Sequence, residues 1–108
     1  MYDASREALG FIAGRTRSDL DRDRLLALGL VKCIEIIGEA ANRISAETQQ
    51  RFPEIPWRGI IAMRHRTVHG YADVDLHVVW QTVSGRLPEL ISAVEAAIRA
   101  LGQSEGDG

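Results

Sequence analysis

Apolar residues recur every three or four positions over the C-terminal part of the chain, and this pattern constrains the fold more than any other feature. They are Leu76, Trp80, Val83, Leu87, Leu90, Val94, Ile98 and Leu101. This spacing matches the 3.6-residue turn and predicts an amphipathic α-helix that begins near Asp75. Pro88 removes one backbone donor and collides with the preceding turn, so we expect a kink or a break near residues 84–87.

A second apolar run follows the acids Asp19, Asp21 and Asp23, which favour a helix N-terminus through the macrodipole. Its apolar members are Leu25, Leu26, Leu28, Leu30, Val31, Ile34, Ile36, Ile37, Ala40, Ala41 and Ile44. These side chains spread round most of the helix circumference, so one packed face cannot bury them all. We expect a helix from the acidic start to about Arg43 that serves both the core and a subunit interface.

Shorter elements complete the pattern. Residues 4–14 form an imperfect amphipathic helix, and residues 45–50 form a short helical turn. The two prolines within residues 52–57 bias their predecessors away from helix, which predicts a rigid connection. Pro56 then suits the start of a further helix, and Gly70 suits its left-handed end.

The chain of 108 residues with 45% hydrophobic content predicts one domain that can bury a core and still gain from a partner subunit. Neither repeats nor strand alternation are found. We therefore expect an all-α, antiparallel four-to-five-helix bundle over residues 1–101 and a flexible tail over residues 102–108.

Composition excludes several classes of protein. Cys33 is the single cysteine, which rules out a disulfide framework and a thiolate zinc site and fits a reducing cytoplasm. No apolar run approaches the roughly 18 residues of a membrane span, and the N-terminus lacks an export signal. We expect a cytoplasmic protein without a membrane partner. A net charge of −2 argues against coating nucleic acid by charge alone.

Proton-handling and phosphate-binding side chains gather in residues 64–71, which read Arg-His-Arg-Thr-Val-His-Gly-Tyr. An imidazole could take the proton from a ribose 2′-OH, while guanidinium groups stabilise charge at the phosphorus. Metal-independent RNA cleavage is therefore our first hypothesis. On spacing alone another interpretation stays open, in which His69 and Tyr71 close a helix end and Arg64 pairs with Glu35 or Glu39.

Geometry favours a site shared between two subunits. On one straight helix, Arg64 and His69 are about 140° apart. They can serve one site if the helix ends by Gly70, or if a two-fold axis brings a second copy of the segment opposite the first. We expect the dimer cleft.

The pattern Arg64-x4-His69-x-Tyr71 resembles the signature of HepT-like toxins, members of the HEPN superfamily of small helical ribonucleases. Other blocks agree in order and approximate spacing, and the likeness covers roughly residues 21–98. These blocks are residues 37–41, 52–57, 63–64, 69–71 and 79–80.

This resemblance implies a HEPN-like homodimer that cuts an RNA such as tRNA or mRNA without a cofactor. Arg64 and His69 are then the catalytic residues, with His65 and Arg66 in support. Many relatives have Asn where this chain has His65. Because an imidazole titrates near neutral pH, this difference leaves open whether His65 or His69 is the base.

The resemblance also implies a partner, a minimal nucleotidyltransferase antitoxin of a type VII-like toxin-antitoxin system, which attaches AMP to Tyr71. The added bulk and negative charge beside Arg64 would compete with substrate phosphate. Glu39 is a candidate for orienting His69 or Arg64. Alternatively, Glu39 belongs to a surface row of ion pairs with Glu35 and Arg43 at helical spacing.

Two further functions fit parts of the pattern. His65 and His69, with His77 or Asp73, have spacing suited to zinc, but Arg66 stands where a zincin has glutamate. The other alternative is a non-catalytic dimeric module that binds nucleotides or the antitoxin, which the near-neutral charge supports. The effect of His69→Ala on activity separates catalysis from binding.

Overall fold

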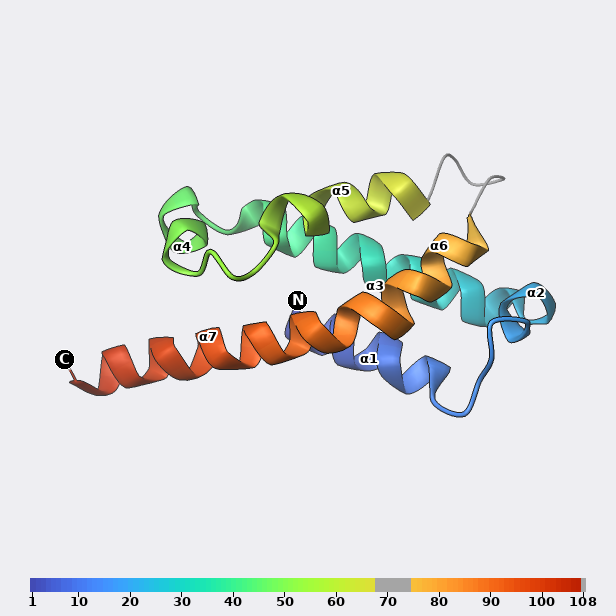
Figure 1. Ribbon diagram of the computed structural model, residues 1–108, viewed down its shortest axis with the longest axis horizontal. Helices are drawn as coiled ribbons and strands as arrows, with labels where there is room; N and C mark the ends of the chain where they lie inside the picture. The colour runs from blue at the N-terminus through green and yellow to red at the C-terminus, as the bar shows by residue number, and fades with distance from the viewer. Residues whose placement is uncertain (68–74, 108) are drawn as a thin grey trace.

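Every secondary-structure element that the structure describes is helical, so the predicted all-α fold is confirmed (Figure 1). The structure is a computed structural model that describes residues 1–67 and 75–107, with side chains for residues 1–63 and 75–102. In chain order, these ranges hold α1 (Tyr2–Ile12), α2 (Asp19–Arg22), α3 (Arg24–Arg43), α4 (Ala46–Arg51), α5 (Trp57–Thr67), α6 (Leu76–Gln81), the π-helical segment η1 (Thr82–Arg86) and α7 (Leu87–Asp107).

Helix α3 packs against four of the other helices. It contacts α5 and α1 along much of its length, and it also contacts α2 and α6. The chain turns back through α4, so that α5 runs antiparallel to α3 (Figure 1). The segments α6, η1 and α7 form one continuous helical stretch, and both η1 and α7 pack on α1.

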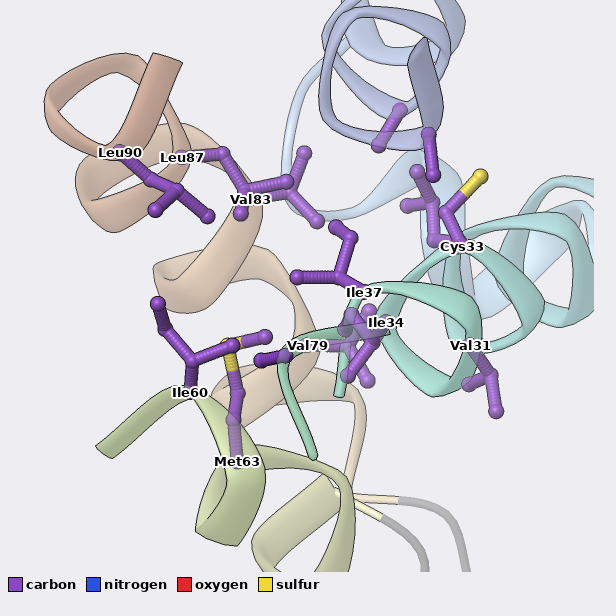
Figure 2. Close-up of a cluster of buried hydrophobic side chains, with 14 of the residues drawn as sticks. Val31, Cys33, Ile34, Ile37, Ile60, Met63, Val79, Val83, Leu87 and Leu90 are labelled. Atoms are coloured by element: carbon purple, nitrogen blue, oxygen red, sulfur yellow. The ribbon is translucent and has the colours of Figure 1, made fainter. Parts of the chain in front are cut away.

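The core brings together one face of α3, the apolar stripe of the C-terminal helices, and buried residues of α1 and α5 (Figure 2). Leu30, Ile34 and Ile37 on α3 are fully buried. The C-terminal stripe is also buried at Val79, Val83, Leu87, Leu90 and Val94. The predicted stripe leaves the core near its end, because Ile98 is 52% exposed. Each fully buried aliphatic side chain contributes about 1.5–3 kcal/mol relative to an exposed one.

A second apolar face of α3 remains uncovered. Leu25 is 84% exposed, and Leu28 and Ile36 are more than 40% exposed. By the 3.6-residue turn, these three positions fall within an arc of about 80°. The ring of Phe11, itself an exposed residue, lies beside Gly29 and extends this surface. The expectation that α3 has more apolar surface than its own fold buries is confirmed.

The sequence predicts one helix from the acidic stretch to Arg43, but the structure divides it at Asp23. The backbone of Asp23 is extended, with φ −118° and ψ 93°, and its carboxylate accepts a hydrogen bond of 3.0 Å from the N–H of Leu26. Arg15 forms an ion pair with the same carboxylate at 3.5 Å. Aspartate satisfies an otherwise unpaired donor of the first turn at this position, so it starts α3 and separates it from α2.

The interruption expected ahead of Pro88 takes the form of a π-helical turn rather than a break. The N–H of Leu87 donates to the carbonyl of Thr82, five residues earlier. In an α-helix the carbonyl of Ser84 would need the N–H that Pro88 lacks, and the proline ring would collide with that carbonyl. The Ser84 hydroxyl also donates to the carbonyl of Trp80 at 2.7 Å. The wider turn therefore accommodates the proline within a continuous helix.

Helix α7 continues past residue 101, where the sequence predicts that a tail begins, and ends at Asp107. This extension contains two glycines, Gly102 and Gly106, each of which costs a helix about 1 kcal/mol relative to alanine. Gln103 and Glu105 are among the residues that cost a helix little relative to alanine.

The buried Cys33 gives a test of the core. Its side chain is 4% exposed, and burial, together with the nearby Glu7 carboxylate, raises the pKa of the thiol. The thiolate is the reactive form, so we expect Cys33 to react slowly with Ellman's reagent at pH 8 in the native protein and rapidly in denaturant. Ser92→Cys, at an exposed position on α7, provides a fast-reacting control. Equal native rates for the two thiols would contradict the buried placement.

Candidate functional site

The first residues of the signature lie at the end of α5. The structure places Arg64, His65 and Arg66 in the last turn of this helix. Their side chains lie outside the described residues, as do the whole of His69 and Tyr71. The described structure therefore gives the positions of α5 and α6, the two helices that precede and follow this segment.

The start of α5 is anchored by the indole of Trp57. Its N–H lies 3.0 Å from the carbonyl oxygens of both Gln49 and Phe52. The side-chain amide of Gln49 in turn donates to the carbonyls of Ala41 and Ile44, at 3.1 and 3.2 Å, which lie at the end of α3. These bonds give partners to two carbonyls at the end of α3, of which that of Ala41 also accepts a bond from the N–H of Ile44. The connection that the sequence predicts to be rigid is thus tied to both α3 and α5.

The following turns of α5 are held by the core. Ile60 and Met63 are 5% and 7% exposed, and their side chains point toward Val79 of α6 in Figure 2. Arg64 comes directly after Met63. A buried residue immediately before the signature restricts movement of the helix at that point.

The far side of the segment is fixed by α6. As predicted, Asp75 begins this helix, and its carboxylate accepts a hydrogen bond of 3.1 Å from the N–H of Val78. The next residue, Val79, is fully buried, and α6 contacts α5. Both helices that flank the connection carrying His69 and Tyr71 are therefore packed in the core.

Glu39 lies on α3, the helix that packs most closely with α5, and it is exposed. Glu35, one turn earlier, pairs with Lys32 at 3.9 Å. Both partners in this pair are well exposed, so it contributes little to stability. The role of Glu39 toward His69 or Arg64 remains a prediction.

Sequence reasoning missed a groove between α5 and the η1–α7 stretch. Its larger part has a volume of about 240 Å³ and is lined by Glu54, Pro56, Gly59, Ile60, Met63, Arg86, Leu87, Glu89, Leu90 and Ala93. A smaller hollow of about 50 Å³ adjoins it, with Gly59, Met63 and Arg86 in common. Pro88 is the sequence feature that could have indicated this groove, because the π-helical turn that precedes it places Arg86 on the groove wall.

The alternative metal site depends on residues that the structure mostly leaves undescribed. His77 is exposed on α6, whereas His69 and Asp73 lie outside the described residues, as does the side chain of His65. Among the described residues, no three histidine, cysteine, aspartate or glutamate side chains are grouped so that they could hold a metal. Within the same part of the chain, no helix is long and apolar enough to cross a membrane.

Comparison with known proteins identifies the family. Residues 1–97 match the model of a family described as ribonuclease HepT-like. A protein of Thermococcus cleftensis named probable ribonuclease HepT is 36% identical over 88 residues, which cover 78% of this chain and 80% of that protein. A second relative, from Caldanaerobacter subterraneus subsp. tengcongensis, is named as an RNase by inference. It is 30% identical over 88 residues, which cover 82% of this chain and 79% of that protein. No solved structure matches. The resemblance predicted from the signature is confirmed, and the chain belongs to the HepT-like ribonuclease family.

Proposed function

We propose that the protein is a metal-independent endoribonuclease that acts as the toxin of a toxin-antitoxin system, with Arg64 and His69 as its catalytic residues. Membership of the HepT-like ribonuclease family supports ribonuclease activity. The observation that supports the assignment to this segment is the burial of Met63, which immediately precedes Arg64 in a helix packed against α3 and α6. A catalytic arginine needs such a fixed base, because small displacements of a catalytic group are costly.

The proposed chemistry uses the ribose itself as nucleophile. His69 takes the proton from the 2′-OH, the 2′-oxygen attacks the adjacent phosphorus, and the bond from phosphorus to the 5′-oxygen breaks. The leaving 5′-oxygen receives a proton, for which His65 is the candidate donor. Arg64 stabilises the charge on the phosphoryl oxygens through its guanidinium, and Arg66 adds positive charge. Glu39 would orient Arg64 or His69 from α3.

We further propose that two copies form the active unit. The uncovered apolar face of α3 supports this, since the large side chains of Leu25, Leu28 and Ile36 on one side of the helix are left in contact with water. A second copy related by a two-fold axis would pack the same face against this one, so that the apolar side chains of both copies are buried. The two signature segments would then face a shared cleft.

The proposed regulation is covalent. A nucleotidyltransferase antitoxin in the same cytoplasm would transfer AMP from ATP to the hydroxyl of Tyr71: the Tyr71 oxygen attacks the α-phosphorus, the bond to the β-phosphate breaks, and pyrophosphate and the hydroxyl proton are released. The phosphodiester adds negative charge and bulk within seven residues of Arg64, where it would compete with the substrate phosphate. Modification would therefore silence the site without unfolding the protein.

Substitution of the catalytic pair tests the activity. We expect His69→Ala and Arg64→Ala to reduce cleavage of total RNA, with EDTA present, by at least about a hundredfold, since each removes a proton-transfer or charge-stabilising group. Matched controls are His77→Ala on α6 and Arg58→Ala at the first turn of α5, both exposed positions. Cleavage that persists in both signature variants would exclude the mechanism. Unimpaired RNA binding without any cleavage by the wild type would favour the binding-module alternative.

Light scattering tests the dimer. We expect the wild type to have the mass of a dimer, and the double substitution Leu25→Glu, Leu28→Glu to shift it toward the monomer, because charge on an apolar interface must be desolvated. Both positions are exposed in the single chain, so the fold is retained. Ile98→Glu, at an exposed apolar position on α7, is the control and leaves the mass unchanged. A wild type at monomer mass would refute the proposed interface.

Intact mass spectrometry tests the modification. After incubation with the cognate nucleotidyltransferase and ATP, we expect the wild type to gain the mass of one or more AMP units and to lose RNA cleavage. Tyr71→Phe removes the acceptor hydroxyl and should gain none, whereas Tyr2→Phe should behave as the wild type. The same adduct on Tyr71→Phe would assign the modification to another residue.

A further inference from the structure

The π-helical turn brings together two polar residues that a regular helix would separate. In an α-helix, residues five positions apart are about 140° apart round the axis. In the structure, Gln81 and Arg86 line the same small hollow, with Thr82 between them on the wall and Gly59 and Met63 of α5 opposite. The i to i+5 hydrogen-bond pattern of a π-helix accounts for this juxtaposition, and such turns are frequent at functional sites.

Arg86 is a cation without a partner in the part of the chain that the structure describes. Its side chain is exposed, and it takes part in none of the ion pairs or hydrogen bonds among the described residues. None of the described residues that line the hollow it shares with Gln81 is acidic. The larger groove next to it has two, Glu54 and Glu89. An anion would therefore be attracted to the hollow and disfavoured in the rest of the groove.

The hollow is also close to the signature. Met63, which lines it, immediately precedes Arg64, and α5 ends four residues later at Thr67, a rise of about 6 Å. On the opposite wall, Gln81 ends α6, the helix that follows the signature segment in the chain. A polymer bound at the end of α5 could therefore reach the hollow.

We propose that this hollow binds a backbone phosphate of the RNA next to the scissile one. Arg86 would hold two phosphate oxygens with its guanidinium, and the Gln81 amide would donate a further hydrogen bond. The acids Glu54 and Glu89 would direct the strand away from the larger groove. This inference rests on the proposed function for its choice of ligand, and it makes Arg86 a binding residue outside the signature.

Salt-dependent binding tests the proposal. The probe is a fluorescent single-stranded oligoribonucleotide, bound to His69→Ala protein so that it stays intact. We expect Arg86→Gln in that background to weaken binding about tenfold, the size expected for loss of a charge-assisted contact. The slope of log K against log salt concentration should fall in magnitude by about 0.7, the value for one phosphate of a single strand. Arg86→Lys should restore the slope but only part of the affinity, because lysine lacks the bidentate fork.

Arg99→Gln, which removes an equal charge from an exposed position on α7, is the matched control and should change neither quantity. Equal losses in the Arg86 and Arg99 variants would reduce the effect to net charge and overturn the proposal, as would unchanged binding by Arg86→Gln. In the cleavage-competent protein, Arg86→Gln should raise KM more than it lowers kcat. If the wild type binds RNA through Arg86 but never cleaves it, the proposed function is wrong and the phosphate site stands. If the protein cleaves RNA and Arg86→Gln binds and cleaves it as well as the wild type does, the phosphate site alone is wrong.

Discussion

Burial of one face of α3 is the constraint on which the rest of the structure depends. Ile34 and Ile37 are fully buried, and the helices packed round them include both helices that flank the signature segment. Truncation of such a residue to alanine typically costs about 2–5 kcal/mol, a large part of the 5–15 kcal/mol that stabilises a small domain. The positions of α5 and α6, which flank the signature segment, therefore depend on the integrity of this core.

The opposite face of α3 raises a different problem. Because the sequence is apolar round most of the helix, burial within one chain leaves Leu25, Leu28 and Ile36 in water. Small domains bury a smaller fraction of their surface than large ones, so association is a common way to gain the missing stability. In the proposed dimer, one helix would supply the core through one face and the shared cleft through the other.

The periodic apolar pattern was sufficient to predict the helices and the buried stripe of the C-terminal stretch, because both follow from a 3.6-residue repeat. The break at Asp23 was predictable only in part. The acids indicated a helix start, but not which one would cap it, since that depends on a single hydrogen bond to Leu26. The signature residues Arg64 and His69 were predicted from residue type and spacing, whereas the groove beside α5 depends on three-dimensional packing that no local pattern contains.

Pro88 disturbs the helix that contains it, but the sequence rule for proline does not say which form the disturbance takes. The missing N–H predicts a disturbance one turn earlier, and a kink, a break or a π-helical turn would each satisfy that requirement. Packing selects among them, because Val83 and Leu87, on either side of the disturbance, are both fully buried and the continuous helix keeps both in the core. The extra residue in the turn then changes the relative orientation of the polar positions, so that Gln81 and Arg86 line one hollow. The π-helical turn that keeps the core intact thus also places Arg86, which has no partner among the described residues, beside the helix that carries Arg64.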